Sequence, residues 1–137
     1  MRAGDCFWTF DHVRDGVEGG HLYFILLDPD QKSGETVVVP CCTIRDHFHD
    51  ASCLLSKGEH KFINGPSFAD YYHALIVTVD EIDERIRAGV ARMKASVSSQ
   101  VLKRLQDGMV SSPHSPSGVR SWFVYRYQSK GRRQSSS

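Results

Sequence analysis

Residues 21–53 read HLYFILLDPDQKSGETVVVPCCTIRDHFHDASC, and this stretch decides the fold. Its two apolar runs, 21–27 and 36–39, predict a pair of strands at the centre of a small sheet, because runs this apolar are typical of strands buried on both faces. Between them lies a turn sequence that contains Asp28, Pro29, Asp30 and Gly34. We expect the second strand to end at Pro40, which has no N–H to donate to a neighbouring strand.

Side chains capable of chemistry are densest directly after that strand. They are Cys41, Cys42, Thr43, Arg45, Asp46, His47, His49, Asp50 and Cys53. A loop held by a rigid sheet is a common place for a functional site. The sequence therefore predicts a site at this end of the sheet.

The remaining elements predict an α+β fold. Further strands are expected at 4–10, 52–55, 60–63 and 74–79, and 68–72 is either a short helical turn or extended. Apolar residues at helical spacing then predict a helix from 80 to about 89, a second from 99 to 110 and a third from 115 to about 127. Short strands first and helices afterwards indicate a small, strongly bent sheet or barrel followed by C-terminal helices.

The chain is expected to form one domain at 1–127, with the barrel at about 4–79, the helices at about 80–127 and a flexible basic, Ser-rich tail at 128–137. Its 137 residues carry a formal net charge of +1, and a charge this small does not by itself indicate binding to nucleic acid. Asp5 and Asp11 fall where a secretory signal needs an apolar core, and no stretch reaches transmembrane length. We therefore expect a cytoplasmic protein, away from membranes, with four reduced cysteines.

Several motifs, in order, resemble a known family. GDCFW at 4–8, GGH at 19–21 and VVVPCCT at 37–43 resemble the MazF/PemK toxins of bacterial toxin–antitoxin pairs. DASCLLSKGEHKFINGPSFADYYHA at 50–74 and VLKRLQDGMVSSPHSP at 101–116 look like a divergent branch of the same fold group. The resemblance implies an SH3-like barrel of five to seven short strands with C-terminal helices. It also implies cleavage of single-stranded RNA without metal or other cofactor, a neutralising antitoxin protein, and a homodimer.

RNA cleavage without metal needs a base, an acid and donors that stabilise the charged phosphorane. The candidate catalytic residues are His21, Thr43 and His60, since imidazole transfers protons near neutral pH. The candidate substrate-binding residues are Arg45, Asp50, Lys61, Tyr71 and Tyr72. Alternatively, the two histidines cap or bridge loops, Thr43 satisfies a strand end and the charged side chains are solvated. Most of the aromatic residues then fill the core, with one of the adjacent Tyr71 and Tyr72 exposed.

The resemblance is incomplete at two positions. The better-known toxins have an arginine after the Gly-His pair, where this chain has Leu22, and the first threonine of their Pro-Cys-Thr-Thr stretch falls on Cys42. Other groups must therefore serve if the chain cleaves RNA. The alternative is a non-catalytic SH3-like module that binds RNA or a protein partner.

Two other chemistries are weaker. The zinc ligands could come from Cys41, Cys42, His47, His49, Asp50 and Cys53. However, adjacent cysteines on an extended chain point in opposite directions, and the sequence has no Cys-x-x-Cys pair. Cys42 or Cys53 could act as a nucleophile with His60, although nothing in the sequence indicates a lowered thiol pKa.

Overall fold

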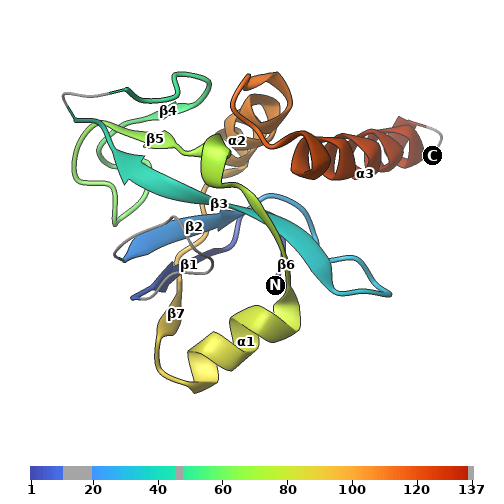
Figure 1. The fold of residues 1–137 in the computed structure, drawn as a ribbon, viewed down its shortest axis with the longest axis horizontal. Coiled ribbons are helices and arrows are strands. Elements are labelled where there is room, and N and C mark those ends of the chain that lie inside the picture. Colours follow the sequence, from blue (N-terminus) through green and yellow to red (C-terminus); the bar gives the residue numbers. More distant parts are fainter. Residues whose placement is uncertain (11–19, 46–47, 136–137) are drawn as a thin grey trace.

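The computed structural model describes residues 1–10, 20–45 and 48–135, with side chains as far as 129. In this part of the chain the elements are β1 (Cys6–Thr9), β2 (His21–Ile25), β3 (Glu35–Thr43), β4 (Leu54–Leu55), β5 (Ser67–Ala69), the 3-10 helix η1 (Tyr71–His73), β6 (Leu75–Thr78), α1 (Val79–Arg87), β7 (Ala91–Lys94), α2 (Ser99–Ser111) and α3 (Ser117–Ser135). The predicted α+β class, with short strands and C-terminal helices, is confirmed (Figure 1).

The described strands form one antiparallel sheet with the order β4-β5-β3-β2-β1-β7, and β6 also pairs with β3. Strands β4 and β7 end this path without pairing to each other, so the described sheet is open and does not close into a barrel. The two longest neighbours, β2 and β3, lie at its centre, as the apolar runs predict.

The turn between β2 and β3 owes its shape to its own side chains. Oδ1 of Asp30 accepts hydrogen bonds of 2.9 Å from the backbone N–H groups of Lys32 and Ser33. These two hydrogen bonds hold the pKa of the Asp30 carboxyl below its usual value, and the bond from Ser33 has the larger effect. Gly34 then takes a φ of +73°, a conformation that favours glycine.

The prediction that the strand ends at Pro40 is wrong. Strand β3 continues to Thr43, because its neighbour on one edge changes at Pro40. Residues 35–38 pair with β6, whereas residues 41–43 pair with β5. The missing N–H of Pro40 falls at this change of partner, and its carbonyl still accepts a 2.9 Å hydrogen bond from the N–H of Asp70.

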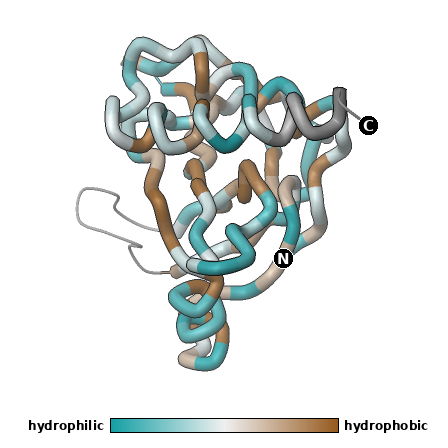
Figure 2. The backbone as a smooth tube through the Cα atoms, turned by 90° about the vertical axis from the view of Figure 1, so that its right-hand side faces the viewer, coloured by the Kyte–Doolittle hydropathy of each residue, from teal (hydrophilic) through white to brown (hydrophobic). Residues whose placement is uncertain are grey.

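Helices cover both faces of the sheet (Figures 1 and 2). One core contains Phe24, Val39, Leu105 and Phe123 with their neighbours, so α2 and α3 pack on that face. The other contains Tyr23, Val38 and Ile82, beneath α1. Because side chains alternate along a strand, consecutive residues of β2 and β3 enter different cores.

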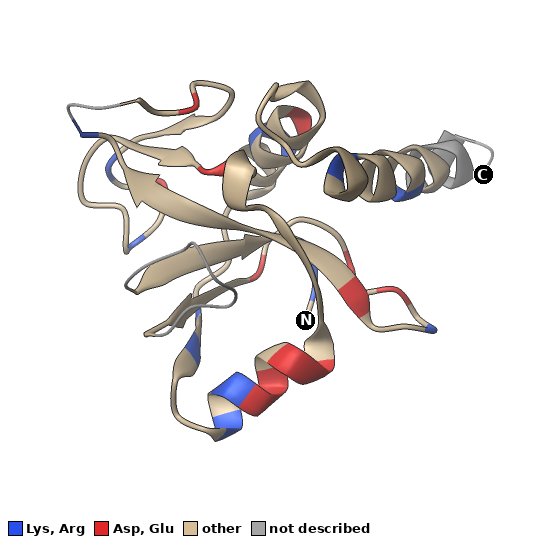
Figure 3. Ribbon diagram, in the orientation of Figure 1, with Lys and Arg blue, Asp and Glu red and all other residues tan. Residues whose placement is uncertain are grey.

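The helix ends follow the sequence. Oγ1 of Thr78 accepts a 3.1 Å hydrogen bond from the Glu81 N–H at the start of α1, and Ser98 caps α2 in the same way. Figure 3 shows acidic residues early in α1 and arginines at its end, which suits the helix dipole. Gly89 follows with a φ of +79°. None of the helices in the described ranges is long and apolar enough to cross a membrane.

Three local predictions differ from the structure. Residues 60–63 form a turn rather than a strand, since the Ile63 N–H donates to the His60 carbonyl at 3.0 Å. Strand β7 was not predicted, because Arg92 and Lys94 are poor strand formers and only pairing with β1 makes them extended. Helix α3 extends beyond Tyr127, to Ser135.

Candidate functional site

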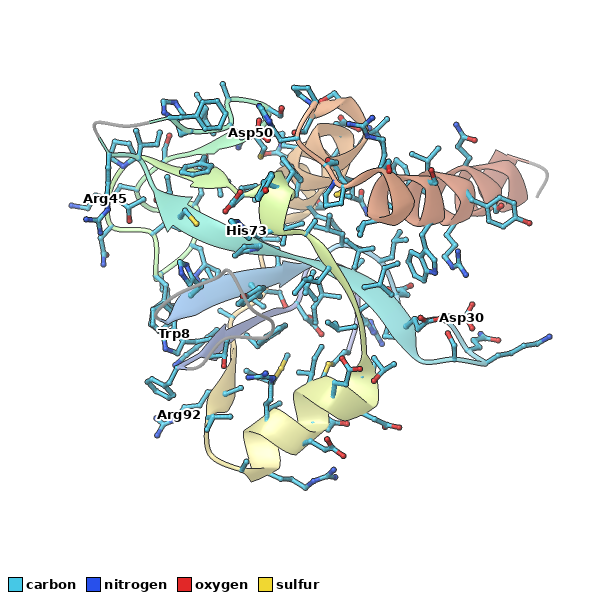
Figure 4. All side chains as sticks on the ribbon, viewed as in Figure 1. Trp8, Asp30, Arg45, Asp50, His73 and Arg92 are labelled. Atoms are coloured by element: carbon cyan, nitrogen blue, oxygen red, sulfur yellow. The ribbon has the colours of Figure 1, made fainter. Side chains whose placement is uncertain are left out.

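A cleft of about 1010 Å³ opens at the end of β3 that lies beyond Pro40. The walls come from β1, β2, β3, β5 and η1, from residues 62–65, and from single residues in the loops after β3 and α2. The lining side chains that can carry proton transfer, charge or hydrogen bonds include His21, Cys42, Thr43, Arg45, Asp50, Asp70, His73 and His114. Figure 4 shows His73 near the middle of β3 and Arg45 beyond its tip.

Four of these side chains contact one another in a row. Nδ1 of His73 lies 2.6 Å from Oδ2 of Asp70, and the Cys42 thiol donates to the same oxygen at 3.8 Å. Sγ of Cys42 also lies 3.9 Å from Nδ1 of His21. We name His21, Cys42, Asp70 and His73 the imidazole wall. It places two imidazoles on one side of the cleft.

The Asp70 carboxylate fixes the tautomer of the His73 imidazole. Nδ1 of His73 carries the proton that it donates to the Asp70 carboxylate, so Nε2 is the acceptor nitrogen of the neutral ring. Nδ1 of His21 lies 3.3 Å from the Cys41 carbonyl oxygen, which can only accept. This contact favours a proton on Nδ1 of His21.

The Cys42 thiol is neutral at the centre of this wall. Burial and the Asp70 carboxylate raise the pKa of Cys42 to about 12. A thiol whose pKa is raised this far stays protonated at neutral pH. Cys42 therefore acts as a small uncharged spacer and donor, rather than as a nucleophile.

The change of strand partner at Pro40 assembles the imidazole wall. Beyond Pro40, Cys42 pairs with Phe68, and Cys41 faces the core beneath α2 while Cys42 faces the opposite side. The hydrogen bond from the Asp70 N–H to the Pro40 carbonyl then holds the start of η1 beside β3. One turn of η1 brings His73 back over Asp70.

A second carboxylate, that of the buried Asp50, supports the other side of the cleft. Oδ2 of Asp50 accepts a 2.5 Å hydrogen bond from the Ser112 hydroxyl, and Oδ1 accepts one of 2.9 Å from the Ser52 N–H. Burial opposes ionisation of Asp50, but these bonds outweigh it and lower its pKa. His114 lies beside this pair, with its ring 4.9 Å from that of Phe48. Asp50 thus ties the loop after β3 to the segment that joins α2 and α3.

Five of the predicted site residues line the cleft. His21 stands at the start of β2, and Thr43 and Arg45 are exposed at the end of β3. Asp50 lines the cleft although only 4% of its surface is exposed. Tyr72, 65% exposed, stands at the mouth. The structure therefore brings together residues that are far apart in the sequence.

The other three predicted residues do not line the cleft. His60 is 5% exposed, and both of its ring nitrogens bind backbone: Nε2 lies 2.6 Å from the Ala95 carbonyl oxygen, and Nδ1 accepts from the Phe62 N–H at 3.1 Å. Tyr71 is fully buried, donates to the Leu105 carbonyl at 2.7 Å, and has a pKa raised by burial. Lys61 is exposed outside the cleft.

Sequence reasoning missed Asp70, His73 and His114. A signal for the first two was present, because Asp and His three residues apart share one face of a helical turn and can pair. His114 offers no comparable signal, since it reaches the cleft only through the packing of α2 and α3.

The structure supports neither the zinc site nor the cysteine nucleophile that the sequence left open. In the described part of the chain, no three His, Cys, Asp or Glu side chains come together in a way that could hold a metal ion; His47, one of the proposed zinc ligands, lies outside the described residues. Burial also raises the pKa of Cys53, and His60 has no ring nitrogen left for a thiol.

In comparisons with known proteins, the chain matches no protein-family model and no curated protein sequence.

Proposed function

We propose that this protein is an endoribonuclease that cleaves single-stranded RNA by proton transfer, without a metal ion. The observation that carries the proposal is the imidazole wall. Two imidazoles line one cleft, His73 with its Nδ1 bonded to a carboxylate, and the exposed Thr43 and Arg45 stand at the same end of β3. The proposal also draws on the ordered motifs that resemble the MazF/PemK toxins.

The chemistry follows from these groups. One imidazole of the wall accepts the proton of a ribose 2′-hydroxyl, and the 2′-oxygen attacks the adjacent phosphorus. The bond from phosphorus to the 5′-oxygen breaks, and the other imidazole gives a proton to that oxygen as it leaves; this second ring must enter the step as an imidazolium, with both ring nitrogens protonated. The products are a 2′,3′-cyclic phosphate and a 5′-hydroxyl. Arg45 and Thr43 donate to the phosphate oxygens while negative charge develops on them.

Asp70 acts through His73. Its carboxylate holds the ring with Nδ1 protonated and Nε2 presented as acceptor. Cys42 donates to the same carboxylate and separates it from His21, so that the two imidazoles keep distinct partners. In this scheme the chain does not need an arginine at position 22, because Arg45, in the loop after β3, supplies the cation.

The test is incubation of the purified protein with a labelled single-stranded RNA in EDTA, beside a DNA of the same sequence, which lacks the 2′-hydroxyl. We expect cleavage of the RNA alone and a cyclic phosphate by mass spectrometry. His21→Ala and His73→Ala should each reduce the rate by about 10²–10⁴-fold, the usual contribution of a general acid or base. Asp70→Asn should reduce it with the fold retained by circular dichroism.

A matched control is available in His49→Ala. His49 contacts the ring of Phe68 at 5.8 Å but does not line the cleft, so its loss should leave the rate unchanged. Intact RNA after incubation with wild-type protein, with and without EDTA, would overturn the proposal. So would wild-type rates in both wall variants.

A second candidate is a non-catalytic RNA-binding or protein-binding module. The observation that favours it is Leu22, which is buried in the core at the position where the better-known toxins have arginine. Wild-type protein that binds the RNA and leaves it intact would support this candidate.

The resemblance further leads us to propose a homodimer and a neutralising antitoxin in the cytoplasm. Light scattering after gel filtration tests the dimer. Co-expression with a small protein encoded beside this chain, followed by co-purification and loss of RNA cleavage, tests the antitoxin.

A further inference from the structure

Three aromatic side chains gather at one end of the cleft. The rings of Trp8 and Phe62 stack with centroids 6.0 Å apart and 26° between their planes, and Phe10 meets Trp8 edge-on at 6.4 Å. We name Trp8, Phe10 and Phe62 the aromatic platform. Trp8 and Phe62 also line the cleft, so the platform is continuous with it.

Two of the three platform rings are exposed although they are large and apolar, and Trp8 is half-buried. Phe10 is 58% exposed and Phe62 is 45% exposed. A folded chain gains nothing from rings left in water, and a cluster of them marks a surface that meets a partner. The structure also holds these rings in place, which argues against accidental exposure.

The His60 side chain and the close approach of Gly20 hold the platform in place. The buried His60 ring accepts the Phe62 N–H and binds the Ala95 carbonyl oxygen, so it ties the turn that carries Phe62 to the segment after β7. Gly20 passes so close to Trp8 that an added Cβ would lie 2.6 Å from Cζ2 of the indole. His60 is thus a positioning residue for Phe62.

Two cations lie beside the platform. Trp8 of β1 pairs with Arg92 of β7, and Cys6 pairs with Lys94, so both cations share a face of the sheet with Trp8. Nζ of Lys94 lies 4.6 Å from the centroid of the Phe62 ring. From 91 to 106 the sequence has no Asp or Glu. Figure 4 shows Trp8 and Arg92 next to each other, on the same side of the molecule as Arg45.

We propose that the aromatic platform, with Arg92 and Lys94, is a subsite that stacks the unpaired bases of single-stranded RNA beside the phosphate held at the imidazole wall. Exposed rings beside cations fit bases joined by phosphates, whereas a duplex hides its base faces. The choice of RNA rests on the proposed function.

Tryptophan fluorescence provides a direct test. The chain has two tryptophans, so Trp122→Phe leaves Trp8 as the single emitter within the platform. The probe is a single-stranded RNA of about 12 nucleotides with 2′-O-methyl groups, which cannot be cleaved by attack of a 2′-hydroxyl. We expect it to quench Trp8 fluorescence on titration, and its duplex with a complementary strand to quench far less.

Variants then separate stacking from charge. In the Trp122→Phe background, Phe62→Ala and Phe10→Ala should each weaken binding by about 5–150-fold, the usual effect of losing one stacked base. Tyr125→Ala is the matched control, since this ring on α3 is 72% exposed, lies outside the cleft and should leave affinity unchanged. Thermal unfolding of each variant shows that it is folded.

The outcomes distinguish the two proposals. Unchanged affinity in both platform variants, equal quenching by duplex and single strand, or no binding of the probe would overturn the subsite. If wild-type protein cleaves RNA at the same rate and affinity as the platform variants, the nuclease stands and the subsite falls. If the probe binds in a platform-dependent way but RNA is never cleaved, the subsite stands and the nuclease falls.

Discussion

Replacing Gly108 with alanine should destabilise the protein, although alanine is the better helix former. Gly108 lies inside α2, where Tyr71 of η1 packs against the helix and donates to the Leu105 carbonyl at 2.7 Å. An added Cβ would lie 2.2 Å from the Tyr71 hydroxyl oxygen and 2.7 Å from Cζ of the ring. Neither atom can move away cheaply, because Tyr71 is fully buried.

Whether Gly108→Ala lowers or raises the free energy of unfolding depends on the gain in helix propensity against the cost of crowding Tyr71. Alanine gains about 1 kcal/mol of helix propensity over glycine. Overpacking a buried site costs about 1–3 kcal/mol, and separating the Tyr71 hydroxyl from its acceptor costs about 1–3 kcal/mol more. The net loss is therefore about 1–5 kcal/mol, and each kcal/mol lowers Tm by roughly 3–6 °C in a domain of this size.

Thermal unfolding followed by circular dichroism measures this loss, and Gly118 provides a matched control. Gly118 also lies in a helix, but an added Cβ there meets nothing within 4 Å, so Gly118→Ala should raise Tm or leave it unchanged. Tyr71→Phe should reduce the cost of Gly108→Ala, because it removes the closer of the two overlaps. A Gly108→Ala protein at least as stable as wild type would refute this account of the packing.

Three further predictions concern a carboxylate, a thiol and a turn. Because folding lowers the pKa of Asp50, the ionised carboxylate stabilises the fold at any pH above the pKa of about 3.9 that Asp50 has in the unfolded chain. This stabilisation is lost as the pH falls through the lower pKa of the folded state. Ser112→Ala should thus cost about 1–3 kcal/mol at pH 7 and progressively less below pH 4 in urea titrations; a cost independent of pH would contradict this. Cys42, with a pKa of about 12, should react with iodoacetamide at neutral pH about 10³-fold more slowly than an ordinary cysteine, and rapid labelling seen by mass spectrometry would count against its buried, neutral state. Gly34→Ala should cost about 1–2 kcal/mol through its φ of +73° alone, since nothing lies within 4 Å of an added Cβ, and Gly34→Asn should cost less in the same titration.

The central hairpin was predictable because the residues that shape it are neighbours in the chain. Asp30 and Gly34 build the turn through contacts within four residues, and the apolar runs on either side leave little choice of register. The opposite orientation of Cys41 and Cys42 follows from the alternation of a strand. Thr78 and Ser98 cap their helices through similarly local bonds.

The composition of the site was harder to predict, because it depends on a contact that no local rule describes. Pro40 signals the end of a strand in isolation, yet here it marks the place where β3 changes neighbours. That change brings Asp70 against β3, where its carboxylate contacts both His73 and Cys42, and Cys42 in turn contacts His21. Residues from β2, β3 and η1 therefore meet only once the sheet order is known.

The contrast between His21 and His60 shows why residue type alone cannot assign a proton-transfer role. Both stand beside strands or turns and carry the same ring. In His60, however, Nε2 contacts the carbonyl oxygen of Ala95, 35 residues away, and Nδ1 accepts from the Phe62 N–H. A ring held in this way can position a neighbour and cannot exchange a proton with a substrate. His73 has a carboxylate on Nδ1 and lines the cleft, so its second nitrogen can take part in chemistry. Substitutions of His73 and His60 should therefore have different kinetic effects. Loss of His73 should lower kcat, whereas loss of His60 should raise KM, because Phe62 is displaced, and should lower Tm.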